Sequence, residues 1–139
     1  SGTGGELGNG TGVSSTSPVA VVMNGVLSGK TIKTLSTSPN QNTTCVIASD
    51  NQVYCWGRAT SFRLGNGQSS TNALAPVSVV TSGVLSGKTI KYLRVGGGAT
   101  CVIASDNRAY CWGTGSSGRL GNGSTTSSSS PVTVTMPSI

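Results

Sequence analysis

Apolar and polar positions follow one another along this chain in short runs, separated by clusters of Gly, Ser, Thr and Asn. β-Branched and aromatic residues dominate runs such as 46–48 and 53–56, a composition typical of strands. No segment keeps a 3.6-residue period over several turns, so we expect almost no helix. The pattern predicts an all-β protein built from short strands.

One stretch occurs twice, as TCVIASDNQVYCWG over residues 44–57 and as TCVIASDNRAYCWG over residues 100–113, with 12 of 14 positions identical. Internal repeats of this kind decide the architecture of a chain. In each copy two apolar runs flank Ser-Asp-Asn, which predicts a β-hairpin with a three-residue loop. The last loop residue, Asn51 or Asn107, is expected at positive φ, which Asn tolerates well.

This hairpin register places Cys45 opposite Cys55 and Cys101 opposite Cys111. Directly opposed Cβ atoms lie about 4.5–5.5 Å apart, close to the distance that a disulfide spans. We therefore predict two disulfides, one within each hairpin. A two-residue turn would instead point the cysteines to opposite faces, and four free buried cysteines are the other alternative. No metal site is expected, because the spacing does not match zinc motifs and the chain has no His.

A second motif, Leu-Gly-Asn-Gly, recurs three times at spacings of 57 and 56 residues. Gly-Asn-Gly requires backbone conformations that most residues avoid, so each copy predicts a tight turn whose Leu is anchored in a core. The residues assigned to these turns are Leu7, Gly8, Gly10, Leu64, Gly65, Gly67, Leu120, Gly121 and Gly123.

Each Leu-Gly-Asn-Gly turn is followed by a Ser/Thr-rich tract and then by an expected strand that opens with Pro. These strands are SPVAVVM from Ser17, APVSVV from Ala75 and SPVTVTM from Ser130; Pro is tolerated at the start of a strand, especially at a sheet edge. The segment GVLSGKTIK then occurs at 25–33 and 83–91. It predicts a turn leading into a strand whose inward residues are Ile32 and Leu35 in one copy and Ile90 and Leu93 in the other.

The motifs together divide the chain into a first repeat at 1–57, which starts mid-unit, a second at 58–113 and a partial third at 114–139. A full unit supplies about four strands. The link to the hairpin is two residues longer at 34–43 than at 92–99, which indicates a surface loop.

The segment GVLSGKT invites comparison with a phosphate-binding loop, but only three residues separate its glycines where that motif requires four. No cofactor is therefore expected. Catalysis is not expected either, since His is absent and the two hairpin Asp residues suit the turn itself. Trp56 and Trp112 would serve as ligand platforms or, as we favour, as core residues, with Tyr54 and Tyr110 on the same face.

Formal N-glycosylation acceptors lie at Asn9, Asn42 and Asn122. The Ser/Thr tracts at 14–17, 69–71 and 124–130 are candidates for O-linked sugar, although such tracts also suit a flexible, unmodified surface.

The chain has 139 residues and a formal net charge of +6. Its basic residues are scattered, so we expect a solvated basic surface with no specific nucleic-acid site. The even, regularly placed cysteines indicate an oxidising, extracellular environment. There is no initiator Met, signal peptide or apolar run long enough to insert into a membrane, and we expect a chain processed or excised from something longer.

The order Leu-Gly-Asn-Gly, Ser-Pro-Val, strand, then TCVIASDN…YCWG resembles the regulator of chromosome condensation repeat over nearly the whole chain. The resemblance implies β-propeller blades of four antiparallel strands. Asp-Asn stands where the family usually has Asp-Gly, and the paired cysteines look like a bacterial secreted branch of the family.

Closed propellers of this family generally have seven blades, and this chain carries about two and a half. Because a repeat buries its faces only against neighbours, three arrangements are open: a fragment of a longer propeller, a ring of several copies, or a head-to-tail filament. The N-terminal partial unit is expected to be able to complete the final blade of a neighbour.

We expect a non-enzymatic structural or interaction protein at a cell surface, in a filament, appendage or adhesin. Its expected partners are copies of itself or the remaining blades of a longer chain, with a protein or glycan as a further ligand. The alternative is a protein-binding module from a complete seven-bladed propeller.

Overall fold

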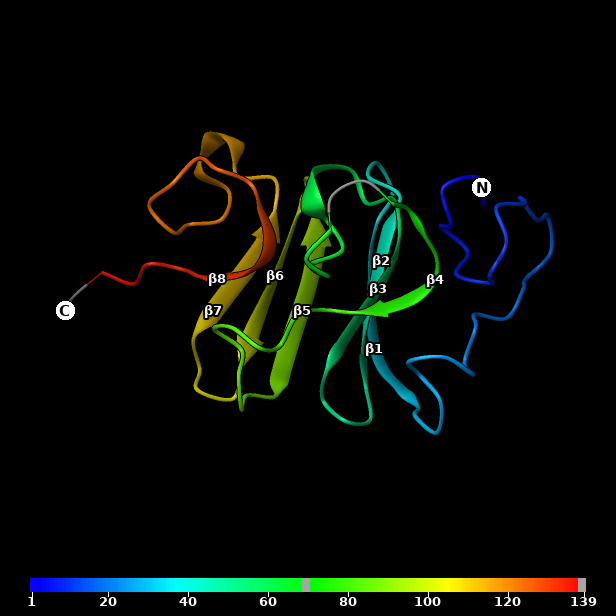
Figure 1. Cartoon of the computed structure of the whole chain (residues 1–139), viewed down its shortest axis with the longest axis horizontal. Helices are drawn as coiled ribbons and strands as arrows, with labels where there is room; N and C mark the ends of the chain where they lie inside the picture. The colour runs from blue at the N-terminus through cyan, green and yellow to red at the C-terminus, as the bar shows by residue number, and fades with distance from the viewer. Residues whose placement is uncertain (69–70, 138–139) are drawn as a thin grey trace.

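The computed structural model describes residues 1–68 and 71–137 and consists of two four-stranded antiparallel sheets (Figure 1). The first sheet has the order β1 (Ile32–Ser38), β2 (Thr43–Ala48), β3 (Val53–Gly57), β4 (Ala73–Ser78). The second has the order β5 (Ile90–Gly96), β6 (Ala99–Ala104), β7 (Ala109–Gly113), β8 (Ser128–Thr133). Within the described ranges, the helical elements are two single 3₁₀ turns, η1 (Thr60–Phe62) and η2 (Ser116–Gly118). The expectation of an all-β fold with almost no helix is confirmed.

The two sheets are out of phase with the sequence repeats. Residues 58–113 contribute β4 to the first sheet and β5, β6 and β7 to the second. The second sequence unit therefore spans two sheets, and the frame 1–57, 58–113 and 114–139 does not mark the sheet boundaries. This arrangement ties neighbouring sheets together through the chain itself.

The two hairpins have the register that the three-residue loop predicts. Cys45 pairs with Cys55, and Cys101 with Cys111. Disulfides join both pairs, with Cα atoms 4.1 Å apart in each. The loops end on left-handed residues in both copies, at φ of 60° for Asn51 and 62° for Asn107.

The two sheets pack face to face, with β5 lying against β1 and β2. Strand residues alternate between faces, so the face of the first sheet that carries Cys45 and Ile47 meets the face of the second that carries Leu93 and Val102. The exposed fractions are 2% for Ile47 and 4% for Leu93. A layer of side chains between the two sheets thus forms part of the core, and Val46, Tyr54 and Trp56 extend the core to the other side of the first sheet.

The expectation that Ile32 and Leu35 point into a core is wrong. These side chains are 41% and 59% exposed, whereas their counterparts Ile90 and Leu93 are each 4% exposed. The second sheet packs against the opposite face of β1 and β2, so no sheet covers this row. The segment GVLSGKTIK is identical in both copies, but only the second copy has a sheet against this row.

The expected strand from Ser17 is also absent, because residues 18–23 have no strand assignment. The related strands β4 and β8 begin before their prolines, and Pro76 and Pro131 are each the fourth strand residue rather than the first. Both strands lie at sheet edges, where Pro does not interrupt a ladder on both sides. Since β8 already fills the fourth position of the second sheet, an N-terminal unit could complete that sheet in a neighbour only by displacing β8.

The two disulfides differ in their surroundings, and this difference leads to a prediction. Cys45 and Cys55 are fully buried by the second sheet, whereas Cys101 is half-buried on an uncovered face. Mild reductant followed by alkylation and peptide mass analysis should show Cys101–Cys111 opening first. Opening of Cys45–Cys55 first, or of both at one rate, would contradict the described packing. The double variant Cys101→Ala/Cys111→Ala should lower the free energy of unfolding by about 2–3 kcal/mol.

Candidate functional site

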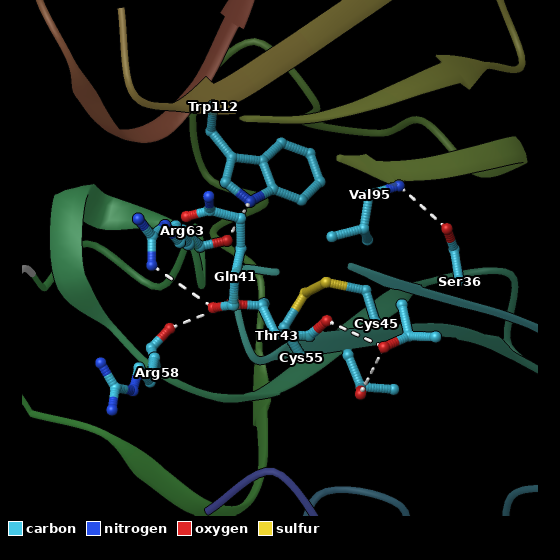
Figure 2. The surroundings of a disulfide bond; sticks show 11 residues. Ser36, Gln41, Thr43, Cys45, Cys55, Arg58, Arg63, Val95 and Trp112 are labelled. Carbon is cyan, nitrogen blue, oxygen red and sulfur yellow. Dashed lines mark hydrogen bonds between the residues drawn. A yellow bond between two sulfur atoms is a disulfide. The ribbon is translucent and has the colours of Figure 1, made fainter. Parts of the chain in front are cut away.

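A tryptophan held under a glycine turn joins the two sheets. The side chain of Trp112 is fully buried, and its Nε1–H donates to the carbonyl oxygen of Arg63 at 3.0 Å. Gly65 lies directly over the indole, and a Cβ on that residue would stand 2.6 Å from Nε1. Figure 2 shows Trp112 reaching toward the side of the first sheet that carries the Cys45–Cys55 bridge. The turn between β3 and β4 of the first sheet therefore holds the indole of Trp112 in the second sheet.

The N-terminal turn makes the same contact with the first sheet. Trp56 is 3% exposed and donates to the carbonyl of Glu6 at 3.1 Å, beneath Gly8. The third turn lies over no indole: Gly121 is exposed, and a Cβ there would meet Val134 Cγ1 at 3.1 Å. Three equivalent turns thus face only two tryptophans in the described residues.

The remaining turn residues lie as follows. Leu64 and Leu120 are fully buried, whereas Leu7 is half-buried. The second glycines of the turns all have positive φ: Gly10 at 83°, Gly67 at 83° and Gly123 at 79°.

Each hairpin also holds a buried tyrosine whose hydroxyl donates to the loop aspartate. The distance is 2.5 Å from Tyr54 to Asp50 Oδ2 and 2.6 Å from Tyr110 to Asp106 Oδ2. Burial, followed by the bond to Asp50, raises the pKa of Tyr54 to about 12. The bond from Tyr110 lowers the pKa of Asp106 below its ordinary value. Both tyrosines therefore stay neutral and serve to fix the loop.

The lysines of GVLSGKT have structural contacts in both copies. Nζ of Lys30 donates to the carbonyl of Val26, and Nζ of Lys88 donates to that of Val84, each at 2.8 Å. Lys30 also lies 5.5 Å from the ring centroid of Tyr54, a cation–π distance. The two GVLSGKT segments therefore pack against the hairpins.

The second sheet ends in an uncovered surface, which we call the outer face and define by Tyr92, Arg94, Cys101, Ile103 and Ala109. Their partners in the strand ladders show that these residues share one side of the sheet. A hollow of about 180 Å³ lies on it, and a second of about 430 Å³ lies beside it between Arg94 and Arg119. The surface is apolar in its centre and basic at one end.

The outer face is the counterpart of the first sheet's covered face. On the first sheet, Ser36 Oγ accepts a hydrogen bond from the backbone N–H of Val95 at 2.9 Å, as Figure 2 shows. Ser36 and Arg94 occupy the same ladder position, opposite the first cysteine of each hairpin. The outer face is therefore equivalent to a surface that already binds a sheet within this chain.

The complementary surface lies at the other end of the molecule. We call it the β1 patch and define it by Ile32 and Leu35. It matches the row of Ile90 and Leu93 that seats the second sheet on the first. The chain therefore carries both halves of its own intersheet contact: the outer face and the β1 patch are uncovered, whereas Val46, Tyr54 and Trp56 on the side of the β1 patch are buried.

Groups for other kinds of chemistry are sparse in residues 1–68 and 71–137. No cluster of three or more His, Cys, Asp or Glu side chains is found there, and no described helix is long and apolar enough to cross a membrane. Asn9, Asn42 and Asn122 are each half-buried, and the Oδ1 atoms of Asn9 and Asn122 accept backbone N–H bonds within their turns. Of the Ser/Thr tracts, positions 69 and 70 lie outside the described residues.

Tyr92, Arg94 and Arg63 were not selected from the sequence. A comparison of the two repeats by face would have found the first two, because Thr34 and Ser36 become Tyr92 and Arg94 on the one side that differs in burial. Arg63 donates to the carbonyl of Gln41 at 3.3 Å, while its Nε is buried without a partner. Burial, with Arg58 nearby, lowers the pKa of Arg63.

A family model described as the regulator of chromosome condensation (RCC1) repeat matches residues 50–104 and 106–138. This chain belongs to the RCC1 repeat family. The matched residues include the Asp-Asn pair of each hairpin loop and the second and third glycine turns.

Several known proteins are similar to this RCC1 repeat chain in sequence or in structure. The E3 ubiquitin-protein ligase HERC2 of Homo sapiens is 32% identical over 88 residues, which are 63% of this chain and 2% of that protein, and the Mus musculus protein matches equally. Prp20p of Saccharomyces cerevisiae superposes with a TM-score of 0.66 at 17% identity, over 78% of this chain and 26% of that one. Human WBSCR16 superposes with a TM-score of 0.62 at 20% identity, over 76% of this chain and 27% of that one. These structural likenesses show the fold.

The glycine under each indole should be intolerant of a side chain. Gly65→Ala should lower the free energy of unfolding by about 2–4 kcal/mol, since its Cβ adds a clash with Trp112 to the cost of a positive φ of 64°. Gly67→Ala is the matched control, because φ is 83° and the nearest atom lies at 3.6 Å. It should cost about 1–2 kcal/mol. Equal losses in urea unfolding would show that the contact with the indole is unimportant.

The tyrosine–aspartate pair should make stability fall at alkaline pH. The pKa of Tyr54 rises from 10.0 to about 12 on folding, so its contribution is complete below pH 10 and is lost as pH rises to about 12. Asp50→Asn should lower the pKa of Tyr54, and Asp106→Asn should leave it unchanged because that residue contacts Tyr110. NMR signals assigned to the Tyr54 ring would follow its titration in each variant, and urea midpoints would follow stability; an equal Tyr54 pKa in the two variants would refute the pairing.

Proposed function

We propose that this RCC1 repeat chain is a non-enzymatic structural and interaction protein that joins copies of itself head to tail, by placing the outer face of one copy on the β1 patch of the next. The observation that carries the proposal is that the outer face and the β1 patch are uncovered counterparts of two surfaces that already bind each other within the chain. A contact between different surfaces propagates, giving a ring if the rotation closes and a filament if it does not.

We further propose that this assembly acts outside the cell, in a filament, an appendage or an adhesin. The support is chemical: two hairpin disulfides in a chain with an even number of cysteines suit an oxidising environment. The assembled sheets would present their loops to a host protein or a glycan. Native material should then carry both bridges and be labelled by a membrane-impermeant reagent on intact cells, and reduced thiols in native material would count against this location.

A second candidate is a protein-binding module within a larger, complete propeller. It is favoured by the finding that the chain corresponds to 26–27% of the structures of Prp20p and WBSCR16. Prp20p has binding properties toward Gsp1p and histones, and yeast RCC1 (Prp20) is bound by Kap60. In this alternative, the outer face and the β1 patch are covered by further blades of the same chain.

A charge at the centre of the outer face should prevent self-association. Ile103→Glu removes an apolar contact and buries an unpaired carboxylate, whereas Ser82→Glu adds the same charge on the exposed loop between β4 and β5 and is the matched control. In sedimentation velocity, the wild type and Ser82→Glu should associate as concentration rises, and Ile103→Glu should remain a monomer.

A complementation test identifies the two surfaces separately. Leu35→Glu blocks the β1 patch and leaves the outer face intact, so it should also be monomeric alone. Mixed with Ile103→Glu, it should form a one-to-one dimer, because each variant retains the surface that the other lacks. A mixture that forms no dimer although the wild type associates would refute the head-to-tail contact.

A further inference from the structure

The chain contains one segment twice, once near each end. Residues 7–23 and 120–136 align without gaps at a separation of 113 residues, and 11 of 17 positions are identical. Both begin with the Leu-Gly-Asn-Gly turn and end at a methionine, Met23 or Met136. Two full repeats lie between corresponding positions, so the second segment is the equivalent of the first on the far side of two sheets.

The two segments would compete for one place in a head-to-tail contact. If the outer face of one copy met the β1 patch of the next as the two sheets meet within the chain, residues 120–136 of the first copy would fall on Trp56 of the second. That place is held by the second copy's own Glu6 and Gly8. Only one turn can lie over one indole.

The structure indicates which of the two segments would be displaced from Trp56. β8 pairs with β7 through Tyr110 opposite Thr133 and Cys111 opposite Val132. Residues 18–23 have no strand partner, and residues 11–20 are exposed throughout. If residues 120–136 of one copy replaced residues 1–23 of the next, the repeat would still be complete. Met136 of the first copy would then precede Asn24 of the second in space, as Met23 precedes Asn24 within one chain.

We infer that residues 1–23, here called the N-terminal cover, are a built-in competitor that caps the first sheet against a second copy of this chain. The inference rests on the proposed head-to-tail function and adds its regulation. The exposed Gly121 is the group that would take over: it would lie on Trp56 of the next copy as Gly8 does within the chain. Removal of the cover would then strengthen association by freeing the indole of Trp56 for the turn of a second copy.

Gly8→Ala tests the cover within the full chain. A Cβ at position 8 would stand 2.7 Å from Trp56 Nε1, whereas a Cβ at Gly12 has no neighbour closer than 3.8 Å. Gly8→Ala should lower the concentration for half-association in sedimentation velocity by at least about tenfold, because the competent state becomes dominant. Gly12→Ala should behave as wild type, and the chain beginning at Asn24 should match Gly8→Ala.

A second glycine distinguishes a specific junction from exposed apolar surface. In the Gly8→Ala background, Gly121→Ala should abolish the gain, because its Cβ would meet the partner's indole. Gly123 is also at a positive φ, 79° against 62° for Gly121, and a Cβ there would have no atom within 4 Å, so Gly123→Ala should preserve the gain. Assembly should also slow the reduction of Cys101–Cys111, as the second sheet shields Cys45–Cys55. Addition of a peptide of residues 1–23 to the chain beginning at Asn24 should return it to monomer.

The outcomes separate the two proposals. If the wild type associates and Gly8→Ala associates no better, the cover is not a competitor and the head-to-tail function stands. If Gly8→Ala/Gly121→Ala associates as well as Gly8→Ala, the proposed junction is wrong. If no variant associates, including the chain beginning at Asn24, the head-to-tail function itself fails.

Discussion

The structure depends on an indole N–H that meets a backbone carbonyl under a glycine. The bond from Trp112 to Arg63 links residues 49 positions apart, and the bond from Trp56 to Glu6 spans 50. Each satisfies the one polar atom of a large apolar side chain that would otherwise be buried without a partner. Because the turn at Gly65 lies between β3 and β4 of the first sheet and Trp112 lies in β7 of the second, their contact fixes one sheet against the next rather than a sheet within itself.

This contact explains why the units depend on neighbours. A four-stranded sheet of this size has two apolar faces, and in this chain each sheet covers one face of the other. Ile47 is nearly inaccessible in the first sheet, while its counterpart Ile103 remains half-buried at the end of the molecule. The same residues therefore act as core or as surface according to position in the array, which is the usual behaviour of repeat proteins.

The local structure could be predicted from the sequence because short-range rules determine it. The Ser-Asp-Asn loop sets the register of each hairpin, and with it the pairing of Cys45 with Cys55 and the positive φ of Asn51. The burial of Leu35 could not be predicted, since the segment GVLSGKTIK precedes both Leu35 and Leu93 and a covering sheet is present only over Leu93. The segment 17–23 has a strand's pattern but no partner, and the outer face differs from its counterpart through two substitutions, Tyr92 and Arg94, that matter only once the sheets are placed.

The loop between the first two strands differs between the two sheets, although the strands themselves are arranged alike. The first sheet carries Ser38-Pro39-Asn40-Gln41-Asn42 at this position, and the second carries three consecutive glycines, Gly96 to Gly98. One loop is bulky and rich in amides, whereas the other bares its backbone beside Arg119. If copies of the chain were joined in an array, these two chemically distinct loops would alternate along it. The loops would then repeat every two sheets, although the sheets themselves repeat one by one.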